Sequence, residues 1–202
     1  MTRKTEISPA DILDLDAYEQ KRTQVRQELA AIKALRRVPV GPHATFYFEC
    51  YETMHYQIQE MLRAERGGEA QLTDELAAYN PLVPKGTDLV ATVMFEIDNA
   101  DERHRLLSQL GGVEDHIFLE VAGARIAARP ERDLERTKES GKTSSVHFVH
   151  FDLTPQQITA FTAPGTRVLV GIEHPRYGHV AIVSEETRGE LSRDLVSDSP
   201  PP

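Results

Sequence analysis

The sequence predicts an α+β fold: a mixed, largely antiparallel sheet of about 6–7 strands, with helices covering one face. Amphipathic helical patterns fill the N-terminal part of the chain, and short β-rich runs closed by turn residues dominate the rest. A chain of 202 residues can bury a core of its own. We therefore expect a single domain over residues 1–196 and a disordered tail at 197–202.

The first element is a short helix that leads into a long one. Ser8, Pro9 and Asp11 supply a capping hydroxyl, a proline for the first turn and an acid at the positive end of the helix dipole. Apolar residues then recur at helical spacing among many charges as far as about Arg37. Residues 38–42 contain two prolines and a glycine and break this pattern, and the aromatic run at 44–50 predicts a strand.

A second amphipathic helix is predicted over residues 51–66. Its apolar side chains fall on one stripe when each residue is turned by about 100°; they are Met54, Ile58, Met61 and Leu62. Gly67 and Gly68 end the helix. A shorter helix at 73–79 precedes the turns at 80–86.

The remaining residues contain what looks like a weak internal repeat of strand, helix, strand, strand. The first copy comprises residues 89–97, 99–110, 116–121 and 125–128. The second copy comprises residues 145–153, a short helix from 154, 167–172 and 179–183. If the repeat is real, we expect the two units to share one sheet around a pseudo-two-fold axis; the alternative is chance recurrence of a common order.

Two segments flank the second copy. Residues 130–143 are almost all polar, which is typical of a loop that closes over a site or of a solvated connection. Ser184 is a cap for a last helix that runs to about Val196.

Composition excludes several classes of protein. Hydrophobic residues make up 40% of the chain and charged residues 27%, which is ordinary for a globular protein. The single cysteine rules out an intramolecular disulfide, and the net charge of −9 opposes binding to nucleic acid. With no apolar run near 20 residues and no signal sequence, we expect a cytoplasmic protein without membrane insertion.

The histidines raise the question of a metal site. His147 and His150 lie three apart in a predicted strand, so they face opposite sides and cannot bind one metal without a bulge. His147 shares its face with apolar neighbours, which favours a buried, neutral imidazole. His116 and Glu120 share a face that we interpret as solvated.

The helix at 51–66 is unusual because amide, acidic and basic groups accompany its apolar stripe. Gln59 and Arg63 are four residues apart and therefore neighbours, while Glu65 projects toward the stripe. A buried acid there would ligate a metal, act as a base, or pair with an arginine such as Arg36. Cys50 precedes the helix and is either an acidified thiol or a small buried hydrophobe. No glycine-rich phosphate loop, nucleophile elbow or zincin motif occurs.

Four motifs in order resemble an uncharacterised bacterial family, the domain of unknown function thirty-five-zero-one. They are YQIQEMLRAER at 56–66, ELAAYNPLVP at 75–84, KTSSVHF at 142–148 and GIEHPRY at 171–177. The resemblance extends from about Ile12 to Val183. The residues that match the family pattern are Gln59, Glu60, Arg63, Glu65, Tyr79, Asn80, His147 and His174. His150 departs from it, because an arginine is more typical there, and His55 lies outside it.

The resemblance implies a context rather than an activity. Genes of this family often lie beside those for rubrerythrin-like di-iron proteins and iron–sulfur oxidoreductase subunits. This implies an accessory role in redox or oxidative-stress metabolism, with such proteins as partners. It leaves open whether the chain is an enzyme and which cofactor, if any, it uses.

Three hypotheses follow. The first is a ligand-binding or accessory protein with Gln59, Glu60, Arg63, Tyr79 and Asn80 around a polar pocket, where Arg63 and His174 hold a small anion. The second is a metalloprotein or metalloenzyme in which His147, His174 and Glu65 ligate iron, manganese or zinc. The third is an interaction protein, such as a homo-oligomer, in which the polar motifs only support the fold.

Overall fold

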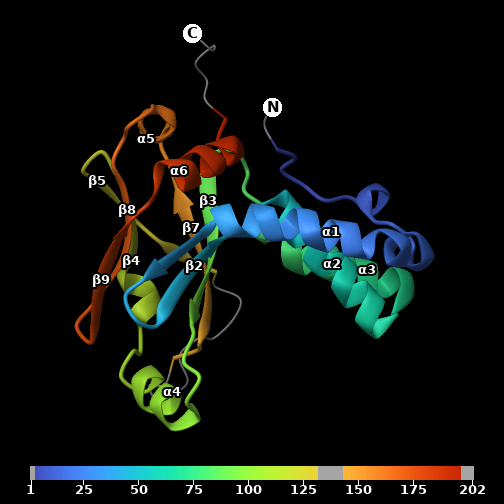
Figure 1. The fold of residues 1–202 in the computed structure, drawn as a ribbon, viewed down its shortest axis with the longest axis horizontal. Coiled ribbons are helices and arrows are strands. Elements are labelled where there is room, and N and C mark those ends of the chain that lie inside the picture. The colour runs from blue at the N-terminus through green and yellow to red at the C-terminus, as the bar shows by residue number, and fades with distance from the viewer. Residues whose placement is uncertain (1–2, 132–142, 197–202) are drawn as a thin grey trace.

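The computed structural model describes residues 3–131 and 143–196 (Figure 1). The predicted tail at 197–202 and nearly all of the predicted polar connection at 130–143 lie outside these residues. Within the described part of the chain, no helix is long and apolar enough to cross a membrane.

Three helices form a layer on the right of Figure 1, and three others lie around the sheets. The layer consists of α1 (Leu15–Leu35), α2 (Tyr51–Glu65) and α3 (Gly68–Tyr79). The others are α4 (Ala100–Leu107), α5 (Pro155–Thr162) and α6 (Glu185–Leu191). Short 3₁₀ turns occur at Pro9–Asp11, Asn80–Leu82, Val113–His116 and Ser192–Asp194.

The strands form two antiparallel sheets. Sheet A has the order β1 (Arg37–Val40), β2 (Ala44–Phe48), β3 (Asp88–Phe95), β7 (Val146–Asp152) and β6 (Arg129–Pro130). Sheet B has the order β5 (Ala124–Ala127), β4 (Ile117–Val121), β8 (Val168–His174) and β9 (Tyr177–Ile182). The α+β class and the antiparallel pairing are confirmed, but the strands divide into two sheets instead of forming one.

The predicted repeat corresponds to a symmetric strand arrangement. The units β3–α4–β4–β5 and β7–α5–β8–β9 place their first strands side by side in sheet A and their hairpins side by side in sheet B. Each unit therefore contributes to both sheets, so the expectation that the two units share a single sheet is wrong. The two-sheet arrangement lets the apolar faces of β3, β4, β7 and β8 meet in one core.

Two apolar cores stabilise the molecule. The larger lies between the sheets and includes Phe46, Phe151 and Val170. The smaller lies between sheet A and the helical layer, where Ile58 of α2 and Val90 of β3 pack with Ile7 from the N-terminal segment. The second core is what fixes the helical layer to the sheet.

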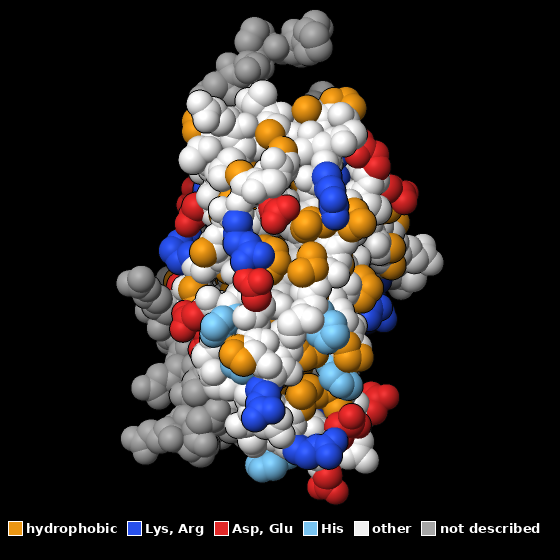
Figure 2. Space-filling model, turned by 90° about the vertical axis from the view of Figure 1, so that its left-hand side faces the viewer, with side chains coloured by type: hydrophobic (Ala, Val, Ile, Leu, Met, Phe, Trp, Pro, Cys, Tyr) orange, Lys and Arg blue, Asp and Glu red, His pale blue; other side chains and the backbone are white. Residues whose placement is uncertain are grey.

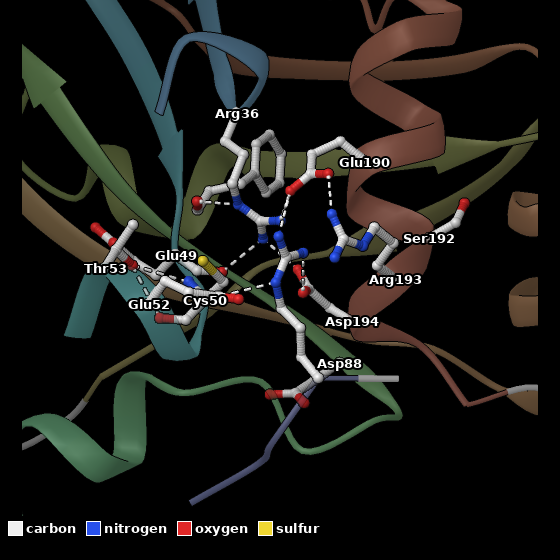
Figure 3. A network of polar contacts seen from close by, with 12 residues as sticks. Arg36, Glu49, Cys50, Glu52, Thr53, Asp88, Glu190, Ser192, Arg193 and Asp194 are labelled. Carbon is white, nitrogen blue, oxygen red and sulfur yellow. Dashed lines mark hydrogen bonds and ion pairs between the residues drawn. The ribbon is translucent and has the colours of Figure 1, made fainter. Parts of the chain in front are cut away.

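A buried ionic network joins the two ends of the chain (Figure 3). Arg36, only 1% exposed, donates to the backbone carbonyls of Phe48 and Glu49 at 2.9 and 2.8 Å, and pairs with Asp194. Arg3 lies 3.1 Å from Asp194. Both guanidiniums also pair with Glu190. The N-terminal segment, the end of α1 and the C-terminal helix are thereby held in one cluster.

Candidate functional site

The N-terminal segment crosses the helical layer as a strap, defined here as residues 3–14, which includes the 3₁₀ turn at Pro9–Asp11. Two side-chain amides hold its backbone. Asn80 Oδ1 accepts from the Ile7 N–H at 2.8 Å while its Nδ2 donates to the Ile7 carbonyl at 2.9 Å. Gln59 does the same to Leu13, at 2.8 and 3.3 Å, and is itself completely buried. Two of the predicted ligand-binding residues thus bind the chain's own backbone.

Two more of the predicted residues join α2 to α1. Glu60 accepts from the Tyr18 hydroxyl at 2.6 Å and from Arg22 at 2.7 and 2.8 Å. The hydrogen bonds with Arg22 and Tyr18 lower the pKa of Glu60 to about 2. Arg63 donates to Glu19 at 2.8 Å on the exposed side of the same helices. These contacts fix α2 against α1 and the strap.

Tyr79, the last predicted ligand-binding residue, ends α3 directly before Asn80. It is half-buried and lines a hollow of about 350 Å³ together with Leu82, Phe148 and Glu131. His174, which we expected to hold an anion with Arg63, lies on β8 in sheet B, on the other side of the molecule from α2 (Figure 1). The structure does not bring Arg63 and His174 together.

A larger cavity opens beside the strap, between α2 and α3, and we call it the strap pocket. Its volume is about 480 Å³, within the usual range for small-molecule sites. Its apolar wall comes from four elements: the strap, α1, α2 and α3. The main apolar contributors are Ile12, Leu13, Leu15, Leu62 and Leu72.

The rim of the strap pocket carries charged groups. Arg66 closes α2 in the left-handed conformation, with φ of 55°, and its N–H donates to the Leu62 carbonyl at 3.0 Å. Within the described residues, its guanidinium makes no hydrogen bond or ion pair. Glu69 and Asp14 also lie at the rim, but Asp14 is engaged as the cap of α1, accepting from Ala17 at 2.8 Å. Arg66 is therefore the cation available to a ligand.

The three predicted metal ligands belong to three different elements, α2, β7 and β8. Glu65 is exposed at the end of α2, where it accepts a hydrogen bond from Gln71 at 3.1 Å instead of pairing with Arg36. His147 and His174 belong to sheets A and B, respectively. No three His, Cys, Asp or Glu side chains are placed to hold a metal ion in residues 3–131 and 143–196.

The two histidines make different hydrogen bonds, although the Glu114 carboxylate influences both. The ring of His147 is buried; its Nε2 lies 2.9 Å from the Ser144 carbonyl, and its Nδ1 is 3.8 Å from Glu114. His174 Nδ1 accepts from the backbone N–H of Arg176 at 3.2 Å. Burial and the nearby ring of His116, 5.1 Å away between centroids, lower the pKa of His174. The lowered pKa favours a neutral imidazole at His174.

Two further candidates also turn out to be enclosed. His150 faces away from His147, as expected, and lies between Asp88 at 3.3 Å and Glu131 at 3.1 Å. Cys50 is fully buried, and burial raises the pKa of its thiol to about 11, so it is a buried hydrophobe and not an activated nucleophile.

Sequence reasoning missed Arg66, Leu72 and the apolar strap residues that line the strap pocket. The available signal was the Gly67-Gly68 break, which forces a tight turn between two helices. The short helix predicted from Ser8 is the 3₁₀ turn at Pro9–Asp11, but nothing in the sequence showed that this segment packs beside α2 and α3.

Fold and site together define a two-sheet α+β protein with a helical layer that carries an apolar pocket. The chain belongs to the family described as "Protein of unknown function (DUF3501)", whose model matches residues 6–195. Among solved structures, it is similar to a novel protein of unknown function from Burkholderia pseudomallei K96243. The two are 36% identical with a TM-score of 0.87, covering 94% of this chain and 99% of the other. No curated protein matches.

Proposed function

We propose that this protein binds a small amphipathic molecule in the strap pocket, with the apolar part of the ligand between the strap and α2–α3 and an acidic group on Arg66. The observation that carries the proposal is the combination of an apolar cavity of about 480 Å³ with an unpaired guanidinium at its rim. Clefts of this size and composition are typical of small-molecule sites.

The residues around the pocket support this role. Leu15 is one of four large hydrophobic side chains that are exposed within the described residues, and it lies on the pocket wall. Gln59 fixes the opposite wall by holding Leu13. The residues of α2 that match the family pattern, such as Gln59 and Glu60, would then shape the pocket without touching the ligand themselves.

The electrostatics of the rim favour an acidic head group. α3 begins at Gly68, so the positive end of its dipole lies at the rim beside Arg66. A Cβ built at Gly68 would meet nothing within 4 Å, so the space there is open. Glu69 opposes an anion, and a ligand that also carries a hydrogen-bond donor would satisfy both groups.

The test is a fluorescence titration with 1-anilinonaphthalene-8-sulfonate, a probe with aromatic rings and one sulfonate. We expect one site per chain, occupied at micromolar probe, with displacement by medium-chain fatty acids. Arg66→Gln should weaken binding about tenfold through loss of a charge-assisted contact. Leu72→Trp should abolish binding by filling the pocket.

Arg26→Gln is the matched control, because Arg26 is an exposed arginine on α1 outside the pocket. It should leave the affinity unchanged. Equal weakening by Arg26→Gln and Arg66→Gln would mean that the probe senses overall charge. Unchanged binding in a folded Leu72→Trp variant would place the probe elsewhere and overturn the proposal.

The redox context and the partners remain predictions from the family resemblance. We propose that the ligand-binding chain serves rubrerythrin-like or iron–sulfur oxidoreductase proteins as an accessory. Pull-down of the purified chain against those proteins, with Arg66→Gln beside the natural sequence, is the measurement. Failure to retain any of them would remove the redox part of the proposal and leave the pocket.

A further inference from the structure

The two sheets have four edge strands, and one of them lacks the protection that the other three carry. Sheets avoid edge-to-edge association by placing charges and prolines on exposed edges. In sheet A, β1 contains Arg37 and Pro39, and β6 contains Arg129 and Pro130. In sheet B, β5 contains Arg125. The fourth edge, β9, has the sequence YGHVAI, with neither a proline nor an acidic, lysine or arginine residue.

The free edge of β9 presents backbone groups for pairing. Val183 donates its N–H to Val168 at 2.9 Å, and paired residues alternate between bonded and non-bonded in an antiparallel ladder. The N–H and C=O groups of Val180 and Ile182 therefore point away from β8. Within the described residues, β9 pairs only with β8. β1 contacts β9 near Tyr177, whose hydroxyl donates to Val40 at 2.8 Å, so the open stretch is the second half of the strand.

The side chains of the same two residues are apolar and exposed. Val180 is 55% exposed and Ile182 67%. In the register of sheet B, Ile182 lies beside Leu169, and Val180 lies beside Gly171. Figure 2 views the side on which sheet B lies and shows hydrophobic side chains among charges of both signs. An edge with free backbone groups and apolar side chains is suited to adding another strand.

The distribution of charge around β9 indicates which protein supplies the added strand. The chain carries a net charge of −9, so two copies repel except where charge is locally balanced. On the outer face of sheet B, Glu173 of β8, the strand beside β9, is neutralised by an ion pair with Arg125 of β5, whose guanidinium lies 3.8 Å from the centre of the Phe118 ring. A basic partner protein would bind acidic surfaces in preference to this edge. The balanced, apolar edge favours a second copy of this chain, because antiparallel pairing about a two-fold axis is self-complementary.

We propose that two copies associate through β9 about a two-fold axis at Ala181, making one continuous sheet from two copies of sheet B. Val180 then pairs with Ile182 of the second copy, and Ile182 with Val180 of the second copy. These two bonded pairs would exchange about four backbone hydrogen bonds and bring four exposed apolar side chains together.

Sedimentation equilibrium over the micromolar range tests this association. We expect a mass near twice 22.7 kDa for the natural sequence. Val180→Lys and Ile182→Lys should each raise the dimer dissociation constant at least about tenfold, because each places a lysine opposite an apolar residue of the second copy. Ala127→Lys is the matched control: Ala127 is exposed on β5, at the opposite edge of the same sheet.

A cysteine variant tests the position of the axis. Ala181 and its copy would form a non-bonded pair with Cα atoms about 4.5 Å apart, within disulfide range. Ala181→Cys should therefore give a covalent dimer under mild oxidation, while Cys50, buried in each copy, does not react. A monomer at every concentration overturns the proposal, as does equal dissociation by Ala127→Lys, which would indicate face-to-face packing. Circular dichroism confirms that each variant is folded.

Discussion

The side-chain amide of Asn80 pairs with the backbone of Ile7 as a neighbouring β-strand would, accepting at 2.8 Å and donating at 2.9 Å. A carboxamide carries the same donor and acceptor as a peptide group, so one side chain replaces one rung of a ladder. Gln59 repeats the arrangement at Leu13. The strap is thus held along its backbone by two helical-layer residues, and Ile7 is delivered to the second core.

Replacing Asn80 with alanine should loosen the strap. It leaves the N–H and C=O of Ile7 without partners, which costs about 1–3 kcal/mol. Urea unfolding measures the loss, and faster amide exchange at Ile7 locates it. Gln24→Ala is the control, since Gln24 is exposed and donates to Glu28 on the same helix. If both variants lose the same stability, the clamp does not hold the strap.

The Glu60 carboxylate should make stability depend on acid pH. Its pKa is about 2 in the folded chain and 4.5 ordinarily, so it is depressed by folding. Its contribution is therefore complete above pH 4.5 and is lost as the pH falls toward 2. Glu60→Gln should flatten the pH profile of the unfolding free energy in this window. Glu28→Gln, at an exposed site, should preserve the profile; an unaltered profile in Glu60→Gln would contradict the assignment.

Adjacent arginines should differ sharply in their effect on stability. Arg36→Met removes a guanidinium that neutralises the buried carboxylates of Asp194 and Glu190. It should lower the free energy of unfolding by about 3–5 kcal/mol. Arg37→Met breaks an exposed pair with Glu96, 3.2 Å apart, and should cost less than about 1 kcal/mol. Chemical denaturation of the two variants side by side is the measurement. Losses of similar size would show that the buried network does not stabilise the chain ends.

Two glycine-to-alanine changes should have opposite signs. A Cβ at Gly171 would lie 2.7 Å from Phe118 Cζ and 2.9 Å from the His179 carbonyl, so Gly171→Ala should cost about 1–3 kcal/mol. A Cβ at Gly189, in α6, would meet nothing within 4 Å, and Gly189→Ala should add about 0.5–1 kcal/mol. Thermal melting curves show whether each variant is more or less stable than the natural sequence. Phe118→Leu added to Gly171→Ala should recover part of the loss, and no recovery would place the strain at His179.

Local features of the fold were predictable because short-range chemistry sets them. The helix predicted at 51–66 is α2 (Tyr51–Glu65), and each predicted hairpin lies within a few residues of an observed one. β1 was missed because Pro39 suggests a break, yet an edge strand tolerates proline. The division into two sheets was missed because alternation shows which face of a strand is buried but not which sheet buries it.

The candidate site was predictable in part. The sequence singled out Gln59 and Asn80 as ligand-binding residues, and in the structure each side-chain amide donates one hydrogen bond and accepts one. Their partners are backbone atoms of Leu13 and Ile7. Because every residue has such backbone groups, the residue types at these positions do not reveal the contacts. For the same reason the strap pocket was not predicted, since its walls come from four elements that only the tertiary fold brings together.

The interleaving of the two units has a consequence for how the chain is made. β3 leaves the ribosome well before β7, with the 50 residues at 96–145 between them, and each is the other's neighbour in the middle of sheet A. The hairpin β4–β5 likewise pairs with β8, which is synthesised later. Neither sheet can close on a partial chain, so folding is deferred until both units have been synthesised. Co-expressed halves of the protein, cut between the units, should therefore fold only with each other.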